Sequence, residues 1–444
     1  MLYQTRARSV TKNIDKKHIY NVLTIVLLNA LLSSISMADS NIEDDLFEFN
    51  GFIETRLGVR IMDDPNQKDV SIGEVRFQFE TEKDLDEATL NLVVDIVYDP
   101  VLDIYSPDLE NGEGIIDLRQ ANIVMSPLDF MDIKLGRQIL TWGTGDLLFI
   151  NDLFAKDWNS FLIGRDVEYL KAPTDAAKIS MFQDLFNVDI VYTPVFGADR
   201  FIDGKRISFF DPVANAPGGK DQPIVVDKPD DAFTDDELSL RLYRSLGANE
   251  LALYYYHGFW KSPAGVNALS GNGTFPSLKV WGASIRGPIV GGIGNAEMGS
   301  YQSDSSAASN ALSRNSEYRF LMGYEQELAT ELTGAVQYYL EHKRDYDAYV
   351  SSLPTGASLD DKNRQVFTLR LTRLLLQQNL SLSFFNFYSP TDEDGYTRFI
   401  AFYKVSDELK MEGGINYFYG NDPHTFYAQF ENNSNIYTAV RYEF

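Results

Sequence analysis

Residues that commonly carry out catalysis are scarce in this chain of 444 residues. It contains no cysteine, which excludes thiol nucleophiles, disulfides and thiolate metal sites. Beyond residue 38 its histidines are His257, His342 and His424, and their wide separation forms neither a metal-binding pair nor a catalytic motif. We therefore predict that the protein is not an enzyme and requires no metal or other cofactor.

Two short motifs could be taken for binding loops. The run 291–294, Gly-Gly-Ile-Gly, resembles part of a phosphate-binding loop, but the full fingerprint and a following helix are missing. The run 392–394, Asp-Glu-Asp, offers carboxylates for calcium, although the ligand spacing is incomplete for a dedicated site. We interpret the first run as a tight turn and the second as a solvated loop.

The charged residues that recur at regular spacing alternate with apolar residues. In the segment 74–80, acidic, basic or amide residues alternate with Val75, Phe77 and Phe79. Successive side chains of a β-strand point to opposite faces, so the pattern gives one apolar and one polar face. In a large closed barrel the polar faces line a water-filled interior. We predict that the pore lining includes Glu54, Arg56, Glu74, Arg76, Glu80, Asp95, Arg119, Arg241, Arg319, Glu325, Arg370, Arg398 and Arg441.

The connections between these expected strands are alternately short and long. The segment 83–87 is short and 99–114 is long, and the rhythm continues to 389–395, which is expected to be long. Tight turns on one side and long loops on the other are typical of an outer-membrane barrel, and Tyr254, Tyr255 and Tyr256 suit its interfacial girdle. We predict an all-β fold, a transmembrane antiparallel up-and-down β-barrel of about 18 strands. The alternative is about 16 strands, if the weak stretches 176–185 and 292–302 are misread.

The first 38 residues differ from the rest of the chain. A basic lead containing Arg6, Arg8 and Lys12 precedes an uncharged stretch that ends at Ala38. This pattern predicts a secretory signal peptide over residues 1–38, followed by a short periplasmic segment, 39–46, and the barrel, 47–444. Without residues 1–38, 34 Lys and Arg stand against 63 Asp and Glu, a net charge of −29. So acidic a chain is a poor partner for nucleic acid.

The last residues form an alternating strand that ends on an aromatic side chain, with Val440, Tyr442 and Phe444 on one face. The segment 135–154 adds a strand with Gly-Arg-Gln, followed by Trp-Gly and a long loop. In these two segments the chain resembles the porin-like family of Gram-negative outer-membrane β-barrels. The resemblance implies a location in the cell outer membrane, in contact with outer-membrane lipid and lipopolysaccharide. It also implies that the barrel assembly machinery recognises the C-terminal strand.

The long connection 144–175 is rich in apolar residues, including Leu147, Phe149 and Trp158. Apolar side chains in such number would be costly to expose, so we predict that the loop folds at least partly into the barrel and narrows it. The alternative is packing on the outer rim. The charged residues of this constriction loop are Asp146, Asp152, Lys156, Asp157, Arg165 and Asp166.

These features together predict a porin-like channel for passive diffusion of small hydrophilic solutes and ions. Two alternatives stay open: a specialised uptake barrel for a hydrophobic, anionic or polymeric substrate, and a structural or adhesive barrel with a blocked lumen. An apolar ladder for uptake would consist of Phe385, Phe387, Phe402 and Phe418, and a basic ladder of Arg76, Arg119, Arg241, Arg319 and Arg370. Acidic loops instead predict modest cation selectivity at low salt. The sequence is compatible with a homo-oligomer and identifies no particular solute.

Overall fold

The computed structural model describes residues 48–444 except 213, 304–309, 311 and 354–356. The expected signal peptide, 1–38, and the periplasmic segment, 39–46, lie outside the described residues and stay predictions. Within the described ranges, no helix is both long enough and apolar enough to cross a membrane.

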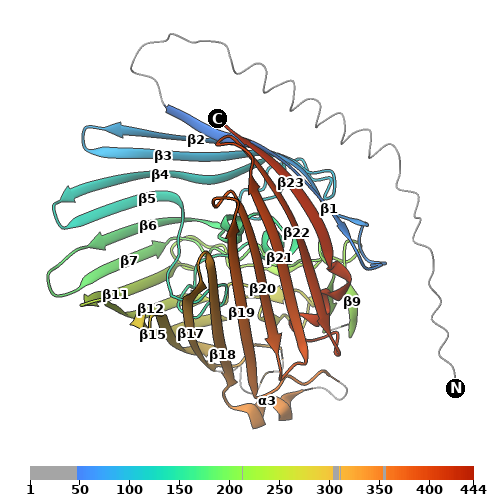
Figure 1. Ribbon diagram of the computed structural model, residues 1–444. Coiled ribbons are helices and arrows are strands. Elements are labelled where there is room, and N and C mark those ends of the chain that lie inside the picture. Colours follow the sequence, from blue (N-terminus) through green and yellow to red (C-terminus); the bar gives the residue numbers. More distant parts are fainter. Residues whose placement is uncertain (1–47, 213, 304–309, 311, 354–356) are drawn as a thin grey trace. The chain divides into compact units, whose positions relative to one another are not determined.

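An antiparallel sheet of 18 strands closes on itself to form a barrel (Figure 1). The first strand, β1, closes it by pairing with the last, β23, with Thr55 opposite Val440. The strands are β1 (Glu48–Arg60), β2 (Val70–Leu85), β3 (Ala88–Tyr98), β4 (Ile116–Leu128), β5 (Met131–Ile139), β6 (Pro173–Met181), β7 (Asn187–Thr193), β11 (Glu237–Leu246), β12 (Asn249–Phe259), β15 (Ser277–Ile289), β16 (Gly292–Ser303), β17 (Glu317–Ala329), β18 (Leu332–Lys343), β19 (Asn363–Leu375), β20 (Leu380–Ser389), β21 (Asp394–Lys404), β22 (Leu409–Gly420) and β23 (Asn435–Glu443). The predicted all-β barrel of about 18 strands is confirmed. The lower strand count is excluded because both weak stretches form strands, β6 and β16.

The connections carry the remaining short elements. These are α2 (Trp158–Ile163), η1 (Val167–Leu170), β8 (Phe209–Asp211), β9 (Ala216–Gly218), β10 (Val226–Asp227), β13 (Gly265–Val266), β14 (Gly273–Thr274), α3 (Tyr346–Ser352) and η3 (Ala428–Asn433). One expected long connection is wrong, because β20 ends at Ser389 and β21 already begins at Asp394. Only the first residue of the glycine-rich run 291–294 lies in a turn, because 292–294 already belong to β16. Val290 and Gly291 join β15 to β16 with φ values of 46° and 81°, and a two-residue hairpin turn of type I′ requires such positive values.

Alternate side chains of each strand face the barrel interior. In β12, Ala252, Tyr254 and Tyr256 are buried, whereas Leu253 lies exposed on the outer face. The expected girdle position of Tyr254 and Tyr256 is therefore wrong, because the two-residue period turns both inward and leaves Tyr255 outside. The outer face of the barrel presents an apolar surface of the kind that contacts lipid.

Candidate functional site

The connection between β5 and β6, residues 140–172, runs through the barrel interior, and we call it the internal segment. Its contacts reach strands far apart around the barrel. Asp146 N donates to Gln337 Oε1 of β18 at 2.8 Å, and Tyr169 Oη donates to Asp95 Oδ2 of β3 at 3.0 Å. The segment begins and ends earlier than the expected 144–175, because 173–175 already belong to β6.

A short helix, α2, turns the chain within the internal segment. Its N-cap residue, Asp157, accepts a hydrogen bond from the backbone N–H of Ser160 at 2.7 Å. Gly164 ends the helix with a φ of 92°, and a Cβ atom there would lie 2.3 Å from the ring of Tyr437 in β23. Glycine is therefore required both by the backbone conformation and by the close approach to the barrel wall.

A single buried carboxylate, Glu297 of β16, fixes the start of the internal segment. It accepts hydrogen bonds from the backbone N–H and the hydroxyl of Thr144, and from Gly145 N at 2.7 Å. It also accepts from the N–H of Asn151 at 3.2 Å and from Nδ2 of Asn151 at 2.8 Å. Sequence analysis missed Glu297, although its inward parity on β16 could have indicated it.

The predicted pore-lining charges of β1 form buried ion pairs. Arg56 Nε lies 2.9 Å from Glu54 Oε1, and Arg56 Nη1 lies 2.9 Å from Glu412 Oε1 of β22. The same Nη1 donates to the carbonyl oxygen of Gly164 at 2.6 Å, and Arg441 of β23 contacts Glu54 at 2.9 Å. These charges therefore join the wall to the internal segment.

A second buried cluster lies on β2 and β3. Arg76 contacts Glu74 at 2.7 Å and also pairs with Asp95, while Arg165 of the internal segment contacts Glu74 at 2.6 Å. The ring of Tyr169 lies 4.3 Å from the Arg76 guanidinium. Removing one partner of such a cluster would leave a buried charge uncompensated.

Charges in the half of β17–β19 toward the short turns are more exposed, whereas Glu317 of β17, nearer the long loops, is buried. Arg370 of β19 contacts Glu325 of β17 at 2.6 Å and Asp146 of the internal segment at 3.1 Å. Their side chains are 33%, 38% and 28% exposed, respectively. Burial nevertheless raises the pKa of Asp146, while Arg370 opposes that change. The interior therefore has a filled side, at β1–β4, and a more open side in the half of β17–β19 toward the short turns.

The other predicted residues are spread around the barrel, each with its own contacts. Arg241 lies 2.6 Å from Glu250, and Arg319 pairs with Glu317. Arg119 donates to the carbonyl oxygen of Lys171 at 2.9 Å, and Arg398 donates to that of Arg165 at 3.0 Å. Glu80 is exposed, in the half of β2 near a short turn. The five arginines of the expected basic ladder thus sit on different strands. All five lie within 4 Å of acidic side chains, and the longest of these distances is 3.9 Å, from Arg119 to Asp117.

The remaining charged residues of the internal segment also have partners. Lys156 lies 2.9 Å from Asp152, and Asp166 lies 3.7 Å from Arg441. Asp157 lies 3.5 Å from Arg200, which belongs to the next long connection, 194–236.

The connection 194–236 packs on the internal segment, a contact that sequence analysis missed. Arg200 also contacts Asp117 of β4 at 2.7 Å, and Asp199 accepts from Lys156 N at 2.7 Å and from Trp158 Nε1 at 3.1 Å. Burial raises the pKa of Asp199, and its hydrogen bonds oppose that change. Apolar residues such as Phe196, which is buried, could have indicated from the sequence that part of this connection is buried.

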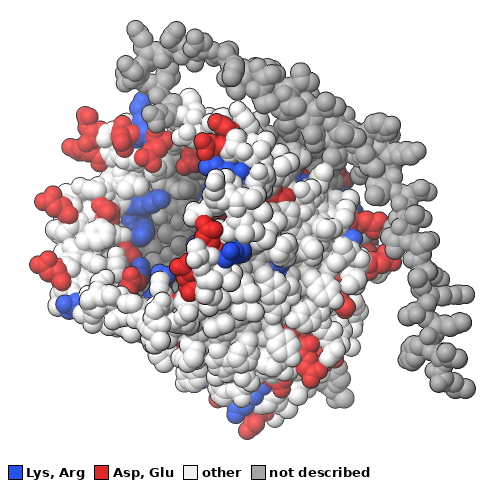
Figure 2. Space-filling view, in the orientation of Figure 1, with Lys and Arg blue, Asp and Glu red and all other residues white. Residues whose placement is uncertain are grey.

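Aromatic side chains line the inner faces of β20–β22. Phe385 and Phe387 have ring centroids 4.4 Å apart, and Tyr396 and Phe418 have centroids 4.5 Å apart. All four are buried, and Phe161 of the internal segment packs edge-on against Tyr396 at 5.7 Å. This cluster is therefore packed against the internal segment on one side. Figure 2 shows that the barrel is hollowed between the short turns, with basic and acidic side chains around the hollow.

The three residues of the predicted assembly signal share the outer face of the barrel end. Val440 and Phe444 are exposed, and Tyr442 lies between them with the same parity. The ring of Phe444 stacks on that of Phe77 at 5.6 Å, and Phe444 N donates to the carbonyl oxygen of Gly51 at 3.1 Å.

No protein-family model and no curated protein matches the sequence. Among solved structures, OccK11 (OpdR) of Pseudomonas aeruginosa is 10% identical, with a TM-score of 0.51 over 89% of this chain and 95% of that chain. A loop L8 deletion mutant of OmpT, an outer membrane protein of Vibrio cholerae, is 12% identical, with a TM-score of 0.41 over 90% of this chain and 99% of that one. A triple mutant of Rhodopseudomonas blastica porin is 10% identical, with a TM-score of 0.40 over 90% of this chain and 100% of that one. With its closed barrel of 18 strands, the chain has the fold of the porin-like outer-membrane β-barrels.

Proposed function

We propose that this protein is an outer-membrane channel for the passive diffusion of small hydrophilic solutes, and not an enzyme. The observation that carries the proposal is the difference between the two sides of the interior. Arg370, Glu325 and Asp146 are each about one third exposed, whereas the charges at the middle of β1–β4 are buried, namely Glu54, Arg56, Glu74, Arg76, Asp95, Asp117 and Arg119. A water-filled route past Arg370 is consistent with that difference.

The internal segment is the proposed constriction of this route. Asp146 extends from it to Arg370, and the resulting ion pair would border the path of a passing solute. A barrel of this strand number encloses a lumen wide enough for water unless something fills it. We therefore expect a conductance well below that of an unobstructed barrel of the same size.

The proposed location rests on the outer face and the terminal strand. Exposed apolar side chains surround the barrel, and the aromatic C-terminus lies at its short-turn end. In bacterial barrels of this kind the short turns and both termini face the periplasm, and the long loops face the exterior. Fractionation of cells that express the full chain tests the location; recovery with soluble periplasm or inner membrane would contradict it.

Ion conductance of the purified protein in a planar lipid bilayer tests the channel. We expect steady, small unitary currents, together with swelling of protein-containing liposomes in small neutral sugars. A protein that inserts as a heat-resistant barrel and yet stays silent at every voltage would refute the proposal.

A second candidate is a barrel with a blocked lumen, whose external loops are the working part. The burial of the ion pairs on β1–β3 and of the aromatic cluster on β20–β22 favours it, because both leave little room beside the internal segment. This candidate predicts that the protein forms an intact barrel and gives no ionic current in planar bilayers.

A further inference from the structure

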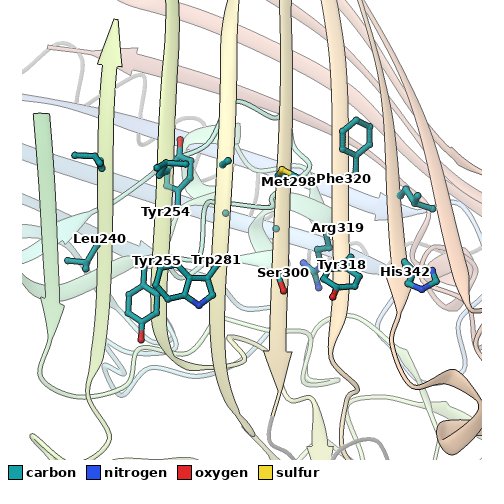
Figure 3. A pocket seen from close by; sticks show the side chains of 16 residues that line it. Leu240, Tyr254, Tyr255, Trp281, Met298, Ser300, Tyr318, Arg319, Phe320 and His342 are labelled. Atoms are coloured by element: carbon teal, nitrogen blue, oxygen red, sulfur yellow. The ribbon is translucent and has the colours of Figure 1, made fainter. Parts of the chain in front are cut away.

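An apolar hollow lies on the outer face of the barrel, over β11–β18 (Figure 3). It has a volume of about 720 Å³. Its lining includes the small residues Gly282, Ala283 and Gly299 and the large residues Trp281 and Met298. Both of these large side chains are 58% exposed. The hollow therefore faces the membrane and not the barrel interior.

Aromatic side chains lie along the edge of the hollow nearer the long loops. Tyr255 and Trp281 have ring centroids 4.5 Å apart, and Tyr318 and His342 have centroids 6.5 Å apart. Figure 3 shows these four side chains at a similar level across neighbouring strands, with Met298 and Phe320 farther from the long loops. Rings of this kind lie at the boundary between hydrocarbon and headgroups.

Basic side chains lie beyond the aromatic row, on its side toward the long loops. Lys279 of β15 is exposed, directly follows the aromatic row and lies opposite His257 of β12 in the strand register. The guanidinium of Arg344 lies 5.2 Å from the centre of the Tyr318 ring. Within the described part of the chain, neither Lys279 nor Arg344 has a carboxylate partner within 4 Å, unlike most of the interior cations.

We propose that this surface binds one phosphorylated lipid of the leaflet on the long-loop side. Along the strands the apolar hollow comes first, then the aromatic row, then the unpaired cations. In such a lipid the acyl chains, the boundary with the headgroup and the phosphate follow one another in the same order. The chains would fill the hollow, and the phosphate would lie between Lys279 and Arg344. A second copy of the chain fits less well, because a symmetric contact would bring these cations against their own counterparts.

The proposal can be tested by the fluorescence of Trp281, because this side chain lies at the hollow. Trp260 is buried inside the barrel, and Trp142 and Trp158 are only partly exposed. The full-length mature protein is placed in phosphatidylcholine nanodiscs that contain a small fraction of phosphatidic acid with brominated acyl chains, which quench tryptophan on contact. Matched discs carry brominated phosphatidylcholine at the same fraction. The W281F variant defines the signal that does not arise at the hollow.

We expect saturable quenching by the phosphatidic acid at roughly thirtyfold lower mole fraction than by the phosphatidylcholine, because each of the two basic residues contributes about 1 kcal/mol at an anionic lipid surface. The double variant K279Q/R344Q should abolish this preference, while K220Q, which removes a cation from another long loop, should preserve it. Circular dichroism and heat-resistant migration verify that each variant is a barrel. Equal quenching by both lipids in the wild type, or an unchanged preference in the double variant, would overturn the proposal. Cross-linked dimers with Trp281 shielded from both lipids would also overturn it, in favour of a second copy. The measurement involves no conductance, so its result is independent of the proposed channel.

Discussion

Replacing Glu297 by alanine should release the start of the internal segment from the barrel wall. Five hydrogen bonds end on this one carboxylate, three of them from backbone N–H groups of Thr144, Gly145 and Asn151. Hydrogen bonds to charged groups contribute about 1.5–3 kcal/mol each to stability, but in the variant water would form hydrogen bonds with some of the released N–H groups. We expect a local loss of about 3 kcal/mol, which is roughly a hundredfold shift from docked to undocked segment.

Two measurements report on this change. Amide hydrogen exchange at Thr144, Gly145 and Asn151 should accelerate by roughly the same factor of one hundred, because exchange follows local opening. Unitary conductance in planar bilayers should rise and become noisier as the segment leaves the lumen. Hydrogen exchange needs no open pore, so it tests the anchor even if the lumen is blocked.

The matched control is Asp189→Ala. Asp189 is also a buried, inward-facing acid, but it contacts Ser180 at 2.7 Å and Arg241 at 3.9 Å, both on neighbouring strands. Its loss should leave exchange at 144–151 unchanged. If Glu297→Ala preserves slow exchange and wild-type conductance in a folded barrel, then other contacts hold the segment and the reasoning about Glu297 is wrong.

Three further predictions concern the channel and its assembly. Arg370→Ala should raise unitary conductance, because it removes the side chain that contacts Asp146. Arg244→Ala, on another strand, should leave the conductance unchanged. Equal currents in the two variants would contradict a route past Arg370. Reversal potentials in a salt gradient should show modest cation preference that fades above about 0.1 M salt, where screening acts within roughly 10 Å. Neutralising the exposed loop acids Asp103, Asp221 and Asp360 should reduce that preference more than Glu74→Gln does, and a clear anion preference at low salt would refute the argument. Deleting Phe444 should leave export intact and lower the amount of assembled barrel in the outer membrane, as measured by heat-resistant migration; a normal amount would remove Phe444 from the assembly signal.

The sequence predicts well what depends on local periodicity. Alternation alone assigns Glu54, Arg56, Glu74 and Arg76 to one face, and all four point into the barrel. The same rule, applied strictly, would have turned Tyr254 and Tyr256 inward as well. Because three tyrosines follow one another at that strand end, the alternation of inward and outward side chains was not recognised there.

Contacts between distant parts of the chain could not be predicted. Arg165 and Glu74 are 91 residues apart, and their pairing depends on how deeply the internal segment enters the barrel. Asp392 and Asp394 look like solvated loop acids in sequence. In the structure Asp392 contacts Arg364 at 2.7 Å, and the buried Asp394 accepts from Tyr427 N at 2.6 Å, because η3 folds over the end of β21. These two acids are therefore poor candidates for setting the charge of the outer mouth.

The unequal burial of interior charges separates the residues that hold the structure from those that would govern conduction. On β1–β3, cations such as Arg56 and Arg76 are buried against acids and the internal segment, so removing either should affect folding first. Arg370 and Glu325 are partly solvated, and exposed pairs contribute about 0–1 kcal/mol to stability. Substitutions there can change the field and width of the route while the barrel stays folded. The open side of the interior is thus where a preference for particular solutes could vary without loss of the fold.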